Sequence, residues 1–321
     1  MHVRQIERAS TDFQQPVDET TLCRAVADAL PGRSVREIVE LDSGLFNNTY
    51  RVGTDDGTFV LKVAPRAETP VYFVERHLME RERTIAPRLA AVHPLVPGYL
   101  GFFEIDGRHA SLQHFIPGRL WHAVEESLTD AENAELWRQL GEFARTVHSV
   151  EGDRFGYPEP FVGAPTWAEF CARNVEGLAD DCRRLDRMHS EVEEFVRIFP
   201  RFRERLDEVT TPHLLHGDLW PRNVLIDGEG ADIRIAAVID GERAFWGDPL
   251  ADWVLILYGV PAAFWDGYGD DLAASGDPVR IDVYKGMNFM LNIVEAERFG
   301  ASDDEPRRWL AAVNDRLRRP H

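Results

Sequence analysis

The sequence predicts an α+β fold of two lobes, in which a small antiparallel sheet with a helix precedes a larger, mainly helical lobe. The first third of the chain holds five short β-type runs, and two of the turns between them are the hairpin signals Asp55-Asp56-Gly57 and Asp106-Gly107. In the remainder, apolar residues recur at helical spacing over long stretches. Because the break Ile116-Pro117-Gly118 separates the two patterns, we expect an N-terminal lobe of residues 1–117 and a C-terminal lobe of residues 118–321.

The N-terminal elements are delimited by caps and turns. Asp18 and Thr20 can cap a first helix, which Pro31-Gly32 ends. A second helix is expected where Glu75, Glu82 and their apolar neighbours recur at three- and four-residue steps. The expected helices span residues 16–30 and 71–89, and the expected strands span residues 34–41, 48–52, 58–63, 99–104 and 109–115.

The C-terminal lobe is expected to be helical around one β-hairpin. Two apolar runs flank the turn Gly228-Glu229-Gly230, which predicts an antiparallel strand pair. The expected strands are residues 224–227 and 233–239, and the expected helices are residues 130–150, 166–187, 191–209, 249–258, 280–299 and 303–317.

Composition narrows the class of protein. The chain has 321 residues, 44% of them apolar and 28% charged, which is typical of a globular protein with a sizeable core. A formal charge of −19 argues against a nucleic-acid partner and suits a cationic small molecule, although it is equally explained as general surface acidity. Three widely spaced cysteines, the lack of an apolar leader and the shortness of the run 253–265 predict a cytoplasmic protein that does not bind membranes.

The polar residues around the predicted hairpin indicate phosphoryl transfer. Asp218 and Asn223 lie five positions apart before the first strand, and Asp240 ends the second. Antiparallel pairing brings Asn223 and Asp240 to a common point, where an amide oxygen and a carboxylate suit Mg²⁺. Asp218 is then free to accept a proton from an attacking hydroxyl. His216 is expected to orient the loop that carries Asp218.

The pattern His216-Gly217-Asp218, Asn223, Asp240 and Gly247-Asp248-Pro249 resembles the aminoglycoside phosphotransferase and choline kinase family. The stretch Leu-His-Gly-Asp-Leu-Trp also resembles the fructosamine kinases of that superfamily. The resemblance implies a bilobal protein-kinase-like fold, with a nucleotide-binding N-terminal lobe and a catalytic, acceptor-binding C-terminal lobe. It also implies that Asp248 and Asp252 brace the catalytic loop.

A kinase needs a fixed cation at the α- and β-phosphates, and Lys62 lies on the third predicted strand, where that lysine is expected. A buried lysine requires a carboxylate partner. Glu82 is predicted to be that partner because it lies mid-helix among apolar positions, with Glu75 as the alternative.

The remaining nucleotide contacts are implied by the resemblance. The loop from Ser43 to Thr49 would hold phosphate oxygens, with Ser43 and Asn48 as its polar residues. Gln113 and Phe115, at the strand end before the break, would offer backbone groups to the adenine. Asp266, Glu295 and Glu297 are candidates for binding ammonium groups of an acceptor, or are ordinary polar surface.

We therefore predict a kinase that uses Mg²⁺ and ATP, or alternatively GTP, to phosphorylate a hydroxyl of a small, amine-bearing molecule such as an aminoglycoside antibiotic. The alternatives are a fructosamine or ketosamine kinase and a non-catalytic nucleotide-binding pseudokinase. A protein kinase is disfavoured, because no Ala-Pro-Glu segment follows Asp240. The oligomeric state is left open between monomer and homodimer.

Overall fold

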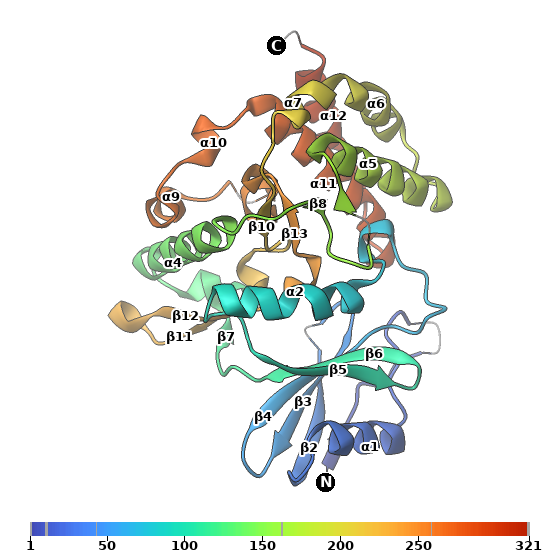
Figure 1. Cartoon of the computed structure of the whole chain (residues 1–321), viewed down its shortest axis with the longest axis vertical. Helices are drawn as coiled ribbons and strands as arrows, with labels where there is room; N and C mark the ends of the chain where they lie inside the picture. Colours follow the sequence, from blue (N-terminus) through green and yellow to red (C-terminus); the bar gives the residue numbers. More distant parts are fainter. Residues whose placement is uncertain (1, 10–11, 43, 162, 258, 320–321) are drawn as a thin grey trace.

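The computed structural model describes residues 2–9, 12–42, 44–161, 163–257 and 259–319, and it has the predicted α+β architecture (Figure 1). A sheet with its flanking helices forms the N-terminal part, and a larger assembly of helices forms the C-terminal part. The predicted fold class is confirmed. No helix among these residues is long and apolar enough to cross a membrane.

The N-terminal sheet has the order β1-β2-β3-β4-β6-β5. Its strands are β1 (His2–Arg4), β2 (Val35–Leu41), β3 (Asn48–Thr54), β4 (Thr58–Val63), β5 (Tyr99–Ile105) and β6 (Arg108–His114). The five predicted strands pair antiparallel, as expected. The prediction missed β1, which pairs parallel with β2, so the sheet is not wholly antiparallel.

Two helices accompany this sheet. The first, α1 (Glu19–Ala29), begins where Asp18 accepts a hydrogen bond from the backbone N–H of Thr21. The second was predicted as one helix over residues 71–89, and this is wrong at its start. A 3₁₀ turn, η1 (Phe73–Glu75), is separated from α2 (Leu78–Val92) by His77, whose left-handed φ of 61° interrupts the helix.

The C-terminal part is mainly helical, as predicted. Its helices are α3 (Trp121–Val124), α4 (Asp130–His148), α5 (Trp167–Arg184), α6 (Ser190–Ile198), α7 (Arg203–Asp207), α8 (Trp253–Leu257), α9 (Ala262–Tyr268), α10 (Leu272–Ser275), α11 (Pro278–Arg298) and α12 (Asp304–Leu317). The prediction missed α9 and α10. The helix expected over residues 191–209 is interrupted by the 3₁₀ turn η3 (Phe199–Phe202), which contains Pro200.

Two small sheets support the loops between these helices. One has the order β12-β11-β7 and includes the predicted hairpin of β11 (Val224–Asp227) and β12 (Arg234–Val238), with β7 (Arg119–Leu120) beside it. The other has the order β10-β13-β8-β9, with β10 (His213–Leu215), β13 (Phe245–Gly247), β8 (Phe155–Gly156) and β9 (Gly163–Ala164). The second sheet was not predicted, because its strands are only two or three residues long.

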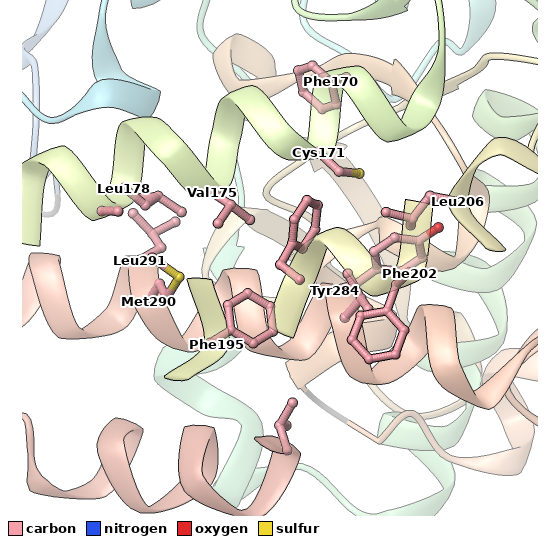
Figure 2. Packing of buried hydrophobic residues seen from close by; sticks show 14 of the residues in the cluster. Phe170, Cys171, Val175, Leu178, Phe195, Phe202, Leu206, Tyr284, Met290 and Leu291 are labelled. Atoms are coloured by element: carbon pink, nitrogen blue, oxygen red, sulfur yellow. The ribbon is translucent and has the colours of Figure 1, made fainter. Parts of the chain in front are cut away.

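The largest apolar cluster lies among α5, α6 and α11 (Figure 2). Side chains of α5 such as Cys171 and Leu178 face Phe195 of α6 and Met290 of α11. These four side chains are at most 2% exposed. Burial of this cluster holds α5, α6 and α11 against one another.

Residues 72–75 fasten the N-terminal part to the C-terminal helices. Glu75 is 2% exposed, and both of its carboxylate oxygens are bonded by the guanidinium of Arg298 on α11. The backbone N–H of Phe73 donates to Asp181 of α5 at 2.6 Å. The ring of Phe73 packs so closely on Gly177 that an added Cβ there would lie 2.2 Å from it.

Candidate active site

The β11–β12 hairpin brings Asn223 and Asp240 to the same end, as the sequence predicted. Val224 pairs with Val238, and the backbone N–H of Ile239 donates to the carbonyl of Asn223 at 2.9 Å. Asp240 follows directly, with a left-handed φ of 61°. Such a conformation is unfavourable for a residue with a Cβ, so the surrounding contacts must hold the carboxylate in this position.

Asp218 and Asn223 are joined through the side chain of Asn223. Its Nδ2 donates to the backbone carbonyl of Asp218 at 2.8 Å and to Asp218 Oδ2 at 3.0 Å. Burial raises the pKa of Asp218 to about 6, against the opposing effects of Arg243 and Asn223. The amide therefore fixes the carboxylate of Asp218 while its own oxygen stays free of this contact.

Asp252, which is fully buried, braces the loop that carries Asp218. Its carboxylate accepts the backbone N–H groups of His216 at 3.2 Å and Gly217 at 3.1 Å. Gly217 has a φ of +76°, and an added Cβ would lie 2.3 Å from the carbonyl oxygen of Arg243. Only glycine fits this turn, and the expected bracing by Asp252 is present.

Lys62 on β4 meets three carboxylates. Its Nζ lies 3.1 Å from Glu82 Oε1, 2.7 Å from Asp240 Oδ1 and 3.1 Å from Glu242 Oε2. Burial alone would lower the pKa of Lys62, but these three carboxylates outweigh it, and the pKa is raised well above its ordinary value. The lysine is therefore a permanent cation that links the sheet, α2 and the end of the hairpin.

Glu82, rather than Glu75, is the partner of Lys62 in the structure. Glu82 is fully buried, and its carboxylate also accepts hydrogen bonds from Tyr99 Oη at 2.5 Å and Ser111 Oγ at 3.4 Å. Glu75 is bound to Arg298 instead. A buried carboxylate with three donors is held rigidly, which suits the positioning of an ammonium group.

The groups at this site carry more negative than positive charge. Three carboxylates face one ammonium, and burial raises the pKa of Glu242. Among the described residues, no three His, Cys, Asp or Glu side chains form a closed metal centre. Mg²⁺ bound together with phosphates needs only one or two protein ligands, so Asn223 and Asp240 are compatible with the predicted ion.

Of the residues predicted to contact the nucleotide, one lies outside the described residues and two have groups that are bonded within the protein. Ser43 lies outside the described residues. Asn48 is 1% exposed, and its amide donates to Glu40 and accepts from Arg108, so its side chain braces the sheet and is not free for a ligand. The backbone N–H of Phe115 is engaged as well, since it donates to the carbonyl of Thr58 at 3.2 Å.

Gln113 lies in β6, between β4 and β5 in the N-terminal sheet. It is buried in β6 and pairs with Val60 of β4 and Tyr99 of β5. Gln113 therefore lies on the strand next to β4, which carries Lys62.

Sequence reasoning did not identify Arg243 as a site residue. Arg243 donates to Glu295 at 2.9 Å, and its charge opposes the rise in the pKa of Asp218. Burial would lower the pKa of Arg243, but Glu295 and Asp218 raise it. Glu295 is therefore paired within the protein, as is Glu297, which binds Arg187. In the sequence, the only sign of these ion pairs is the pair of acidic residues Glu295 and Glu297.

Comparison with known proteins assigns the family. The sequence profile of the phosphotransferase enzyme family matches residues 37–287, which include Lys62, Asp218 and Asp240. The chain belongs to this family. The predicted family and the predicted enzyme class, an ATP-dependent small-molecule kinase, are both confirmed.

Individual relatives of this phosphotransferase are distant. The probable ketoamine kinase of Staphylococcus aureus is 23% identical over 291 residues, which cover 83% of this chain and 90% of the relative. A structure from Haemophilus somnus, provisionally named a fructosamine-3-kinase, has a TM-score of 0.66 at 15% identity and covers 94% of this chain and 97% of its own. The GDP complex of an aminoglycoside 2′-phosphotransferase of type IIIa has a TM-score of 0.64 at 16% identity, with coverages of 93% and 99%. The two structures establish the likeness in fold.

Proposed function

We propose that the chain is a ketoamine kinase, which transfers the γ-phosphate of ATP to a hydroxyl of a sugar that carries a substituted amine on the carbon next to its carbonyl carbon. The observation that carries this proposal is the match to the probable ketoamine kinase of Staphylococcus aureus, because it extends over 83% of this chain and 90% of the relative. A match of that extent includes the acceptor-binding part as well as the nucleotide-binding part. A ketoamine acceptor therefore takes the place of the aminoglycoside predicted from the sequence.

The chemistry is assigned to the residues around the hairpin. The acceptor oxygen attacks the γ-phosphorus, the bond from that phosphorus to the β-phosphate oxygen breaks, and Asp218 receives the hydroxyl proton. Asn223, through its amide contact, holds the Asp218 carboxylate in place for this transfer. A base with a pKa near 6 is largely deprotonated at neutral pH, as the reaction requires.

We assign the nucleotide to the region around Lys62. The Lys62 ammonium would bind the α- and β-phosphates while Glu82 keeps it in place. Asn223 and Asp240 would hold Mg²⁺, which neutralises phosphate charge. The backbone of residues 44–47 and of the strand end at Gln113 would complete the nucleotide site.

An aminoglycoside kinase is the second candidate, favoured by the net charge of −19. A pseudokinase is the third. The presence of Lys62, Asp218, Asn223 and Asp240 speaks against a pseudokinase, because together these residues supply each charge that the reaction needs.

One acceptor screen separates the three. Release of ADP would be measured with Mg-ATP and either fructosyl amines or aminoglycosides, and the products would be weighed by mass spectrometry. We expect transfer to the fructosyl amines, reduced about 10²–10⁴-fold in Asp218→Asn, whose folding is checked by circular dichroism. Transfer to aminoglycosides alone would overturn the proposal. Stabilisation by Mg-ATP with no transfer to any acceptor would point to a pseudokinase.

A further inference from the structure

A cavity of about 100 Å³ lies beside the loop that carries Asp218 and is lined by residues of the C-terminal part and by Val74 of η1. Gly217, the residue before Asp218, lines it on one side, together with Arg243. On the other side it reaches α5, α8 and α11. A molecule whose hydroxyl meets Asp218 therefore has this space within reach of its adjoining substituent.

The walls of this cavity are apolar and aromatic. They include Trp167 and Phe170 of α5, Phe245 of β13, and Tyr284 and Leu291 of α11. Among the described residues that line it, none is an aspartate or a glutamate. A polyammonium group would find no counter-charge here, whereas an apolar group would gain from leaving water.

Two residues that line the cavity each carry a buried hydrogen-bond donor that has no partner among the described residues. Asn288 is 7% exposed, and its Nδ2 is buried without an acceptor, as is Trp253 Nε1. Buried unpaired donors are uncommon and unfavourable. Other polar side chains of the wall are satisfied: Trp167 Nε1 donates to Tyr284 Oη at 2.7 Å, and Tyr284 Oη donates to Asp248 at 2.7 Å.

We propose that this cavity binds the nitrogen substituent of the ketoamine acceptor, and that this substituent is apolar, the size of one aromatic ring, and carries a carbonyl oxygen. The carbonyl accepts hydrogen bonds from Asn288 and Trp253, and the ring lies against the aromatic wall. An apolar cavity of about 150 Å³ holds benzene, so a ring would fill this space of about 100 Å³ and extend from it toward the loop that carries Asp218. The inference rests on the proposed function and gives it a substrate class: ketoamines of apolar amino acid derivatives rather than of lysine side chains.

Three fructosyl amines test the two contacts separately. The phenylalaninamide adduct has both ring and carbonyl, the glycinamide adduct lacks the ring, and the phenethylamine adduct lacks the carboxamide. We expect the phenylalaninamide adduct to have a KM at least about tenfold below that of either of the other two adducts. Equal KM values for all three would overturn the inference.

Filling the cavity tests its location. Ile256, which lines the cavity on α8, is replaced by tryptophan, and Ile256→Leu serves as a control of unchanged size. Ile256→Trp is expected to raise the KM of the phenylalaninamide adduct to that of the glycinamide adduct and to leave the latter unchanged. A KM for the phenylalaninamide adduct that stays at the wild-type value in Ile256→Trp would overturn the assignment.

The donor contact is tested with Asn288→Leu. Because this change removes an unpaired donor, the thermal midpoint of the free protein should stay level or rise. The KM of the phenylalaninamide adduct should rise about tenfold, whereas that of the phenethylamine adduct should not change. A lower midpoint with unchanged KM values would show a structural role and overturn the assignment of this donor.

Failure of the proposed function is distinguishable from failure of this inference. If no fructosyl amine is phosphorylated, the proposed function fails. Calorimetric titration with the same three adducts then decides the inference. Tighter binding of the phenylalaninamide adduct, lost in Ile256→Trp, supports it, and equal or undetectable binding of all three overturns it.

Discussion

Replacing Asp252 with alanine should release the catalytic loop and destabilise the protein. The carboxylate of Asp252 accepts four hydrogen bonds, from the backbone N–H groups of His216, Gly217 and Trp253 and from Nε2 of His148. The donor-to-acceptor distances are 3.2, 3.1, 2.8 and 3.0 Å in the same order. Alanine leaves all four donors without this acceptor in a fully buried position.

The expected loss can be estimated from these contacts. A buried donor left unpaired costs about 1–3 kcal/mol, and the four costs are not additive, because the loop relaxes. Removing one partner of a buried charged pair typically costs about 3–5 kcal/mol in total. With a urea dependence of about 3 kcal/mol per molar, the unfolding midpoint should fall by about 1–1.7 M.

Urea unfolding followed by circular dichroism measures this shift, with Asp266→Ala as the control. Asp266 is exposed on α9, so its loss should change stability by less than about 0.5 kcal/mol. Turnover of Asp252→Ala should fall under conditions where the variant is still folded, because the loop that carries Asp218 has lost its brace. A midpoint within 0.2 M of wild type, or full activity, would refute this reasoning; that limit is roughly 0.6 kcal/mol.

The pH dependence of the same variant follows from the pKa of Asp252. Burial would raise that pKa, but hydrogen bonds from His148 and charge from His148 and His216 outweigh it, so the pKa lies below its ordinary value of 3.8. A carboxyl whose pKa is depressed on folding stabilises the protein above pH 3.8 and loses that effect as the pH falls through the folded-state pKa. The difference in unfolding free energy between wild type and Asp252→Ala should therefore be full at pH 7 and shrink below pH 3.8.

Three further changes test other parts of the structure. Lys62→Met should lower the free energy of unfolding by about 3–5 kcal/mol at pH 8, because Glu82 loses its buried partner. It should regain part of this loss at pH 5, where Glu242, whose pKa burial raises to about 7, is protonated; thermal midpoints at both pH values check it. Gly177→Val should lower the thermal midpoint by several degrees, since its side chain would meet the ring of Phe73. Iodoacetamide followed by peptide mass mapping should label half-buried Cys23 in the native protein but Cys171, whose pKa burial raises well above its ordinary value, only after denaturation.

The sequence was sufficient for the elements that have strong local signals. The Asp-Gly turns located the strands of the N-terminal sheet, and the hairpin pairing followed from the turn at residues 228–230. Short strands such as β1 and β8 have no such signal, because two or three residues show no period. The start of the second helix was predicted wrongly for a similar reason, because the residue types around His77 do not indicate a left-handed backbone.

For the candidate site, spacing predicted which residues come together but not how each side chain is used. The pairing of Lys62 with Glu82 followed from the position of Glu82 on the buried helix face. Asn48 was misjudged because its partners Glu40 and Arg108 are brought together only by the folded sheet. Glu242 reaches Lys62 through the turn η6 (Gly241–Arg243), which a linear pattern does not reveal.

The bond between Glu75 and Arg298 has a consequence for motion of the two parts. In Figure 1 the chain crosses between them near one end of α2, and residues 72–75 touch the C-terminal helices near the other end. Together with the ion pairs of Lys62, these two separated attachments, one covalent and one ionic, hold the N-terminal sheet near both ends of α2. A motion of the sheet that keeps both attachments is therefore a rotation about the line between them rather than a separation at either end.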